Sequence, residues 1–386
     1  MQALSTRRLW PWFTLLAAAL LAVAGAWVFM RSPEPPRERG DAGSEAQILE
    51  SLIDAAAEAS FARPSGAWQP ALPRDHGAHP EARSETWSLS AHLRGPDGAP
   101  IGLEIVFTRF GLRPPQAADD SPWAVDALYR AHAILVRADA PPISEERFAR
   151  SGTAAAGFAN GAPEIWLDDW AIRADENAAL QVFGSVDGRE FRLTLAPGAQ
   201  PVPVGESDGV GEAREADTPV RGYALPRLAV TGQIAGIPVT GEAWHDHLWG
   251  ELPLPGGPVA YDRLILHLDD GTALTLLRTR RRDGRGGASV DGLQVGPDGE
   301  TEALSGGAVE MTPSAEWRPD GTDTRYPVRW EVAGGGLVLD VSPLIDDQRH
   351  AFAAPLWSGL VAVDGTRGGR PVRGLGTLQL TGYDAP

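Results

Sequence analysis

Short β-rich runs separated by tight-turn signals are the feature that most constrains this chain. Runs such as Glu85–Leu93 and Ala260–Leu268 recur from about residue 85 to the C-terminus. Between them stand Asp-Gly pairs, among them Asp187-Gly188 and Asp364-Gly365, and such pairs make hairpin turns because glycine accepts a positive φ. Strands do not alternate with helical patterns, which argues against a doubly wound nucleotide-binding sheet. We therefore predict an all-β chain of barrel or sandwich type.

A polar stretch rich in glycine and proline, residues 198–219, interrupts this β pattern. Each of the two pieces that it separates is long enough for one barrel or sandwich of roughly eight to ten strands. We therefore predict two β domains, at residues 72–217 and 218–386.

The start of the chain carries a membrane signal. An uncharged run from Leu9 to Met30 follows Arg7 and Arg8. As a helix this run would span roughly 33 Å, enough for the hydrocarbon layer, and basic residues before it favour a cytoplasmic start. A cleavable signal peptide that ends near residues 22–24 is the alternative. We favour an uncleaved transmembrane helix within residues 1–30. It would anchor the chain in the inner membrane as a single-pass protein, with the bulk in the periplasm or outside the cell.

Residues 31–71 would connect this anchor to the β region. Residues 31–42 are rich in proline and charge, which is typical of an extended tether. Apolar side chains recur at helical spacing in Ser44–Phe61, so we predict a short amphipathic helix there.

The composition excludes several kinds of chemistry. No cysteine occurs in the chain, and all 34 basic residues are arginine. Thiol catalysis, cysteine-ligated metals and a lipid-modified cysteine are excluded, and so is Schiff-base chemistry on lysine. The net charge of −17 would be repelled by a phosphate backbone, so we expect no nucleic-acid partner.

Polar side chains with catalytic potential concentrate in the segment GEAWHDHLWGE. If this segment is a strand, His245, His247 and Trp249 share one face, because side chains alternate along a strand. Trp244 and Asp246 then share the opposite face. The histidine pair raises the question of a metal site, since two imidazoles at this spacing can present nitrogens to zinc.

A zinc site would need a third ligand, and no spacing in the sequence fixes one. The residues that could supply it are Glu242, Asp262, His267 and the two histidines of the preceding loop, His76 and His79. The alternative is that the histidines only hydrogen-bond main-chain or aspartate oxygens at a barrel mouth. We predict neither a metal nor a cofactor.

Asp262 is a candidate acid. In a strand over Ala260–Leu268 it shares a face with three leucines, and a carboxyl group that loses solvation has a raised pKa. Such a group holds a proton at neutral pH and donates it, while nearby tryptophan rings stabilise a carbocation. The alternative is an ion pair between Asp262 and Arg263 or another arginine.

Eight segments resemble motifs of one known family. They are residues 73–80 (PRDHGAHP), 167–170 (LDDW), 223–232 (YALPRLAVTG), 241–250 (GEAWHDHLWG), 268–271 (LDDG), 326–330 (YPVRW), 347–348 (DQ) and 380–383 (LTGY). Together they resemble the AttH/CrtC-like family, which includes carotenoid 1,2-hydratase (hydroxyneurosporene synthase). The resemblance runs from about Leu72 to Tyr383.

This resemblance implies two lipocalin-like β-barrel or sandwich domains, which the predicted transmembrane helix would precede. In the hydratase members a double bond of an isoprenoid is protonated and water adds to the cation, without a cofactor. His247 and Trp249 match the His-x-Trp pair of the family, and Tyr261 and Asp262 are the best candidates for its tyrosine and aspartate. Other members are envelope proteins, some of them associated with ABC-type export systems.

Two functions follow as hypotheses. We favour a membrane-anchored lipocalin-like protein that binds an apolar ligand, a lipid or an isoprenoid, as an accessory to an ABC-type permease. The residues expected to contact this ligand are His76, Trp87, Trp244 and His245. The alternative is a cofactor-independent hydratase, which would make the chain an enzyme. Its catalytic residues would be Asp262 or Asp246 as proton donor, His247 to orient the donor, and Trp249 and Tyr261.

Overall fold

The computed structural model describes residues 60–66, 68–115, 124–159, 163–205, 220–252 and 258–383. All of them fall in one compact unit, Leu49–Pro386. The predicted anchor and tether, and nearly all of the predicted helix at Ser44–Phe61, lie outside the described residues. Within the described ranges, no helix combines the length and the apolar character that a membrane crossing requires.

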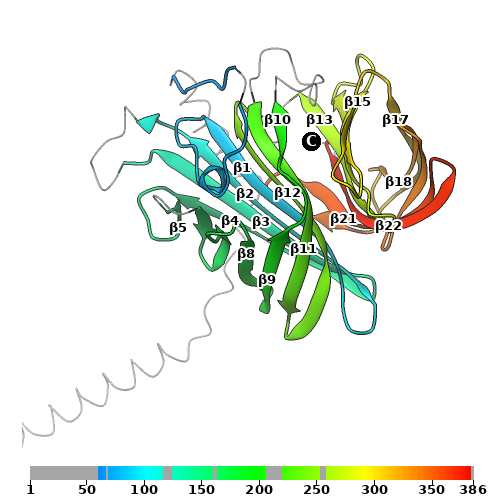
Figure 1. The fold of residues 1–386 in the computed structure, drawn as a ribbon, viewed down its shortest axis with the longest axis horizontal. Coiled ribbons are helices and arrows are strands. Elements are labelled where there is room, and N and C mark those ends of the chain that lie inside the picture. The colour runs from blue at the N-terminus through cyan, green and yellow to red at the C-terminus, as the bar shows by residue number, and fades with distance from the viewer. Residues whose placement is uncertain are drawn as a thin grey trace, which may run out of the picture. The chain divides into compact units, whose positions relative to one another are not determined.

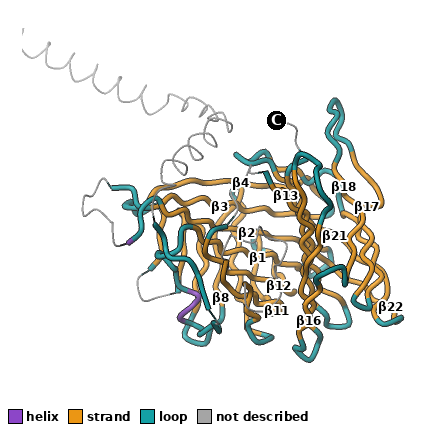
Figure 2. The backbone as a smooth tube through the Cα atoms, turned by 90° about the horizontal axis from the view of Figure 1, so that it is seen from above, coloured by secondary structure: helices purple, strands orange, loops and turns teal. Residues whose placement is uncertain are grey.

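The described part of the chain is almost entirely β-structure, as the sequence predicts (Figure 2). One helical turn, η1 (Arg74–His76), precedes the first strand. The strands of the first sheet are β1 (Ser84–Arg94), β2 (Pro100–Gly111), β3 (Ala127–Arg137), β4 (Ala140–Arg150), β5 (Ala156–Phe158), β6 (Glu164–Leu167), β7 (Trp170–Ala174), β8 (Leu180–Val186), β9 (Arg189–Pro197), β10 (Val202–Gly205), β11 (Val220–Ile234) and β12 (Ile237–Gly250). Those of the second sheet are β13 (Val259–Leu268), β14 (Ala273–Arg281), β15 (Ser289–Val295), β16 (Thr301–Leu304), β17 (Val309–Trp317), β18 (Tyr326–Gly334), β19 (Leu337–Pro343), β20 (Arg349–His350), β21 (Leu356–Arg367) and β22 (Arg370–Thr381).

Neighbouring strands pair in antiparallel fashion in both sheets. The first sheet runs in the order β4-β3-β2-β1-β12-β11-β9-β8-β7-β6-β5, with β10 beside β11. The second runs β16-β15-β14-β13-β22-β21-β19-β18-β17, with β20 beside β21. Both sheets are curled, and Figure 1 shows the second sheet closer to a closed barrel than the first. This architecture is consistent with two lipocalin-like domains.

The domain boundary predicted between residues 217 and 218 stays a prediction. The chain passes from the first sheet to the second between Gly250 and Val259, so β11 and β12 belong to the first sheet. In that sheet β12 pairs with β1, which places the GEAWHDHLWG segment beside the start of the β region.

Two-residue turns close several hairpins, as the sequence pattern predicts. Asp187-Gly188 joins β8 to β9 with φ values of 48° and 70°. Gly368-Gly369, which is not among the predicted turns, joins β21 to β22 with φ values of 56° and 76°. Positive φ at both positions is the type I′ geometry, whose twist matches that of the flanking strands.

The turn predicted at Asp364-Gly365 is wrong, because this pair lies inside β21. Gly365 is paired with Leu339 of β19 and with Val372 of β22, so hydrogen bonding on both sides continues the strand. A Cβ atom at Gly365 would lie 2.2 Å from the main-chain oxygen of Val338. Glycine therefore serves here for the close approach of two strands rather than for a turn.

The two sheets pack against each other through the outer faces of their central strands. Ile265 of β13 and Trp244 of β12 belong to one apolar cluster between the sheets, and Ile134 of β3 and Leu360 of β21 belong to another. Among the buried polar contacts between the sheets, the Ser358 hydroxyl donates to the carboxylate of Glu104 at 2.7 Å. The interface therefore combines apolar packing with satisfied polar groups.

A chain of neutral histidines lies in this interface. Nε2 of His267 faces the carbonyl oxygen of Pro226 at 2.8 Å, so it carries the proton and Nδ1 is an acceptor. Nδ1 of His92 lies 2.7 Å from that acceptor and donates to it, while Nε2 of His92 accepts from the hydroxyl of Thr377. Burial, together with the nearby His267 ring, holds the pKa of His92 well below its usual value. Every ring nitrogen is thus satisfied with both rings neutral.

His350 of β20 is a further histidine between the sheets. Its Nδ1 lies 3.0 Å from the hydroxyl of Ser144 in β4, and its Nε2 lies 2.8 Å from the carbonyl oxygen of Ser358. Burial lowers the pKa of His350 to about 4, although the main-chain oxygen and Glu104 oppose the shift. The folded state therefore holds this ring neutral at a pH where the unfolded chain is already protonated.

We predict that the free energy of unfolding falls as the pH drops from 6.5 towards 4. The unfolded chain binds a proton at each histidine near pH 6.5, whereas buried rings bind it only below their lowered pKa, so stability is full above pH 6.5 and decreases below it. Each such ring contributes up to about 1.4 kcal/mol per pH unit. Urea unfolding of the full chain, followed by tryptophan fluorescence at a series of pH values, measures this slope.

The variant His350→Asn isolates the contribution of one ring. Its slope between pH 6 and 4.5 should be smaller than that of the parent chain by about 1 kcal/mol per pH unit. The neighbouring variant Arg349→Gln changes no group that titrates in this range and should keep the parent slope. The same pH slope of the unfolding free energy in the parent chain and in His350→Asn would contradict this account.

Candidate functional site

The side chains of the GEAWHDHLWG segment alternate between the two faces of β12, as the sequence predicts. His245, His247 and Trp249 point into the interior of the first sheet, and all three side chains are buried. Trp244 and Asp246 point the other way, towards the second sheet. The predicted ligand contact at Trp244 and the predicted donor Asp246 are therefore on the opposite side of the strand from His247.

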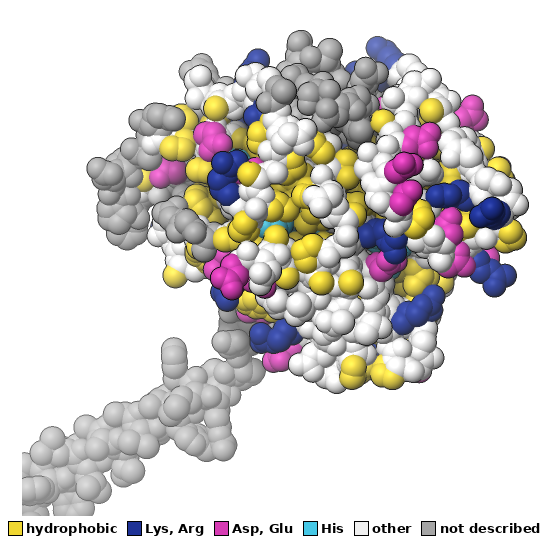
Figure 3. Space-filling model, in the orientation of Figure 1, with side chains coloured by type: hydrophobic (Ala, Val, Ile, Leu, Met, Phe, Trp, Pro, Cys, Tyr) yellow, Lys and Arg dark blue, Asp and Glu magenta, His cyan; other side chains and the backbone are white. Residues whose placement is uncertain are grey.

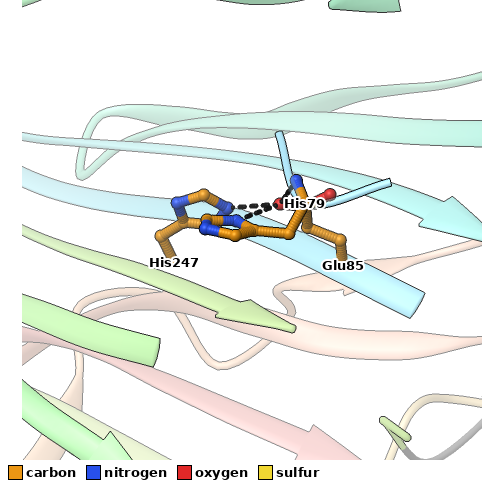
Figure 4. A group of neighbouring side chains, drawn as sticks. All are labelled: His79, Glu85 and His247. Atoms are coloured by element: carbon orange, nitrogen blue, oxygen red, sulfur yellow. Dashed lines mark hydrogen bonds and ion pairs between the residues drawn. The ribbon is translucent and has the colours of Figure 1, made fainter. Parts of the chain in front are cut away.

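The carboxylate of Glu85 is the centre of a buried polar cluster in the first sheet (Figure 4). Its Oε1 lies 2.8 Å from Nε2 of His247 and 3.0 Å from Nδ1 of His79. The main-chain N–H of His79 donates to the same oxygen at 2.8 Å. Glu85 belongs to β1, His247 to the neighbouring β12, and His79 to the segment between η1 and β1, so the cluster ties three parts of the chain together.

Arg109 neutralises the second oxygen of this carboxylate. Its Nε donates to Oε2 of Glu85 at 3.2 Å, and its Nη2 donates to the carbonyl oxygens of His79 and Ala82. Burial alone would raise the pKa of Glu85, but the hydrogen bonds from His247 and His79 and the charge of Arg109 lower it to about 2. Glu85 is therefore a buried carboxylate whose charge is balanced by its neighbours.

The pair of Glu85 and His247 holds one proton between them. Nδ1 of His247 lies 3.0 Å from the carbonyl oxygen of Asp75, which only accepts, so Nδ1 carries a proton. Nε2 faces the carboxylate oxygen of Glu85, and two lone pairs at 2.8 Å would repel each other, so a further proton lies between these atoms. Burial lowers the pKa of His247, against the hydrogen bond to Glu85, which favours release of that proton.

His76 and Tyr223 form a second hydrogen-bonded pair beside His247. The hydroxyl of Tyr223 lies 2.6 Å from Nδ1 of His76. Tyr223 is paired with His247 in the sheet register, and a Cβ atom at the preceding Gly222 would lie 2.1 Å from the main-chain oxygen of His247. Glycine at that position therefore lets β11 approach β12 closely enough to bring the tyrosine ring beside the histidine.

His76 leaves one ring nitrogen without a partner. Burial, with the nearby rings of His245 and His247, lowers the pKa of His76 to about 3, so the ring is neutral. Burial raises the pKa of Tyr223 well above its usual value, so its hydroxyl keeps its proton. When that hydroxyl donates to Nδ1 of His76, the proton of the ring is on Nε2, which is buried and has no hydrogen-bond partner among the described residues.

Aromatic rings enclose these polar groups. Trp87 stacks on His247 with ring centroids 4.6 Å apart, and Trp249 stacks on His79 at 3.6 Å. Nε1 of Trp87 also donates to the carbonyl oxygen of His76. The expected ligand residues His76, Trp87 and His245 thus lie on one interior face, and Trp249 lies beside them.

Asp246 is held in an ion pair between the two sheets. Its Oδ2 accepts from Arg263 of β13 and from the hydroxyl of Ser88, and its Oδ1 accepts from Nε1 of Trp244 at 2.8 Å. These contacts satisfy a carboxylate, and none of them involves His247.

Asp262 lies in the interior of the second sheet, on the same face of β13 as its three leucines. Its Oδ2 accepts from Arg278 at 2.7 Å, from Arg280 at 3.4 Å and from the hydroxyl of Tyr383 at 3.1 Å. Burial raises its pKa, as the sequence predicts, while the two arginines oppose the shift. Tyr261 is on the other face and is 39% exposed, so the tyrosine partner of Asp262 is Tyr383.

The structure therefore does not bring Asp262 or Asp246 to His247. The carboxylate that contacts His247 is Glu85, which is not among the predicted site residues, and neither are Arg109 and Tyr223. A signal for Glu85 exists in the sequence, because it alternates with Trp87 and Leu89 on the apolar face of a predicted strand.

Three side chains offer the geometry of a metal centre. Ligand atoms of His79, Glu85 and His247 lie within 4.8 Å of one another. However, Oε1 of Glu85 already accepts from both rings, and Arg109 places a positive charge on Oε2. A cation would compete with these donors for one carboxylate, so the donor set fits a hydrogen-bonded pair better than a metal. Of the other predicted ligands, Glu242 pairs with Arg227.

Comparison with solved structures places this architecture among known proteins. The structure of an AttH protein from Nitrosomonas europaea matches with a TM-score of 0.71 and 29% sequence identity, covering 84% of this chain and 100% of that one. Kievitone hydratase from Nectria haematococca matches with a TM-score of 0.58 and 14% identity, covering 85% of this chain and 97% of that one, which is a likeness of fold.

Sequence comparison identifies the family. No curated protein sequence matches this chain significantly. The sequence profile of the AttH-like family, in contrast, matches residues 63–383, which is most of the chain and nearly all of its described part. The chain belongs to the AttH-like family.

Proposed function

We propose that this chain binds an apolar ligand of the lipid or isoprenoid type at the interior face of the first sheet. Membership of the AttH-like family and the lipocalin-like architecture support this, because such curved sheets hold apolar ligands in their interior. In Figure 3, hydrophobic side chains gather in the middle of the view, over the first sheet, with a histidine among them. The aromatic rings of Trp87 and Tyr223 supply the same character around the cluster.

The observation that carries the proposal is the unpartnered Nε2 of His76. A buried donor without an acceptor costs about 1–3 kcal/mol, so native proteins rarely keep one without a reason. An oxygen atom of a ligand would satisfy this donor while the surrounding rings hold the apolar part of the same molecule. The ligand that fits is therefore an apolar chain with one hydroxyl or carbonyl group.

We predict that the chain distinguishes farnesol from farnesene, which share an isoprenoid skeleton and differ in the hydroxyl group. Because only farnesol offers an oxygen to Nε2 of His76, it should bind about threefold to tenfold more tightly than farnesene. This is the difference in affinity that one hydrogen bond usually makes. Quenching of tryptophan fluorescence in the full chain measures both affinities, with Trp87 as the nearest reporter.

The variant His76→Leu tests the assignment of the donor. It should bind farnesol and farnesene equally, since the variant keeps an apolar side chain but has no N–H group. The control His350→Asn alters a buried histidine between the sheets and should keep the preference for farnesol. Equal binding of the two probes by the parent chain would remove the proposed role of His76.

A cofactor-independent hydratase is the second candidate, and the proton shared by Glu85 and His247 favours it. This proton would pass to one carbon of an isoprenoid double bond. Water would add to the other carbon and return a proton to the pair, so the reaction consumes only the alkene and water. Stacked tryptophan rings would stabilise the intermediate cation. In this mechanism the proton comes from the Glu85–His247 pair rather than from Asp246 or Asp262.

We predict that incubation with farnesene yields a product that is heavier by one water, detected by mass spectrometry. Glu85→Gln should lower the rate at least about 100-fold, because a general acid contributes that much or more. Asp246→Asn and Asp262→Asn remove carboxylates that do not contact His247 and should keep the rate. Full turnover by a folded Glu85→Gln variant would exclude this mechanism.

We also propose that the uncharged run Leu9–Met30 anchors the protein in the inner membrane, with the β-structure on the outer side. An ABC-type permease in the same membrane is the partner that this location favours. The full chain should stay in membranes washed with alkaline carbonate, whereas a chain that starts at residue 31 should be released. Release of the full chain by the same wash would rule out the anchor.

A further inference from the structure

A cavity of about 340 Å³ lies at the end of the second sheet, where β14 continues into the loop of residues 282–288. Four arginines line it: Arg278, Arg280, Arg281 and Arg282. Pro313, Pro327 and Tyr383 add apolar surface to its wall. The whole chain has a net charge of −17, whereas four guanidinium groups make the charge around this small cavity positive.

The acidic residues nearby do not balance these arginines. Arg278 and Arg280 share the single carboxylate of Asp262, and both contact the same oxygen. Arg281 pairs with Asp283 at 2.8 Å, whereas the side chain of Arg282 has no ion pair or hydrogen bond within the described ranges. This leaves an excess of about two positive charges at the cavity.

One further acidic side chain, Glu316, lines the cavity, and its charge is also engaged. It pairs with Arg325 at 3.4 Å, and Arg325 does not line the cavity. Glu316 therefore does not remove the positive excess that Arg282 and the Arg278–Arg280 pair create.

Two of the arginines lie over aromatic rings, and both also contact Asp262. The guanidinium carbon of Arg280 lies 4.0 Å from the ring centroid of Tyr383, and that of Arg278 lies 5.6 Å from the ring centroid of Trp330. A guanidinium group stacked on a ring keeps its planar fork of N–H donors in one orientation. These donors are therefore arranged before any ligand arrives.

Beneath the arginines the hydrogen-bond network is incomplete. Asp262 and Trp330 are fully buried, and both contact Arg278. Oδ1 of Asp262 and Nε1 of Trp330 have no hydrogen-bond partner among the described residues. One acceptor and one donor without partners thus lie next to an arginine that lines the cavity. Buried polar atoms rarely lack partners in a sheet interior that serves no function.

We propose that this cavity binds a phosphate group. The planar guanidinium fork matches the oxygens of phosphate, with which it forms paired charge-assisted hydrogen bonds. A volume of about 340 Å³ is at the lower end for ligand sites, so the ligand is small or enters only with its head group. Both inorganic phosphate and the phosphate head of an amphiphile have this chemistry, and the proline walls favour the amphiphile. This site belongs to the second sheet and does not depend on the histidine cluster of the first.

Calorimetric titration of the full chain at low ionic strength tests the proposal with inorganic phosphate and with n-hexyl phosphate. Both should bind, with sodium chloride at equal ionic strength giving no comparable heat. n-Hexanol is the matched neutral probe and should not bind at this site. Tighter binding of n-hexyl phosphate than of inorganic phosphate identifies an amphiphile head group, and equal binding identifies free phosphate as the ligand.

Two variants distinguish this cavity from general attraction by a positive surface. Arg282→Gln removes a guanidinium that has no partner to lose, so the fold should be kept and phosphate affinity should fall about tenfold or more. Arg285→Gln changes an exposed arginine of the same loop that does not line the cavity, and it should leave the affinity unchanged. Equal losses in both variants, or equal heats from phosphate and chloride, would overturn the proposal.

Discussion

The buried carboxylate of Glu85 is the interaction on which the interior of the first sheet depends. An ion without partners in such a place costs several kcal/mol, so the surrounding chain has to supply compensating donors. Arg109 comes from β2, His247 from β12 and His79 from the segment that follows η1. A single charge therefore ties β1 to its two neighbouring strands and to the segment that follows η1. The loss of any one partner would leave the remaining charges unbalanced in the interior.

The alternation of side chains along the central strands decides what each residue can do. On β12, His247 faces the interior of the first sheet, whereas Asp246 faces the second sheet and pairs with Arg263. On β13, Asp262 faces the interior of the second sheet and Tyr261 does not. Residues that are adjacent in the sequence thus serve different parts of the molecule. One face of each strand contributes to a candidate site, and the other holds the two sheets together.

Much of the fold could be predicted from the sequence, because Asp-Gly turns and apolar alternation are local signals. Several strands lie outside the predicted runs, and composition explains two of them: β4 has prolines near its start and is rich in charge, and β17 contains Pro313. Both are edge strands, where a missing N–H group and exposed charges are tolerated. The site was predictable only in part. The face of His247 and Trp249 follows from alternation, but its contact with Glu85 joins residues 162 positions apart, and this depends on which strands pair.

The electrostatics of the two candidate sites differ in kind. Asp246 and Asp262 are each held by arginine, and although burial raises the pKa of Asp262, neither carboxylate contacts His247. The proton in the first sheet lies instead between Glu85 and His247, enclosed by aromatic rings, where a neutral apolar molecule would meet it. The second sheet presents fixed guanidinium groups in excess of their carboxylates, and these favour an anion. The two sheets therefore offer different chemistry, the first to a neutral apolar molecule and the second to an anion.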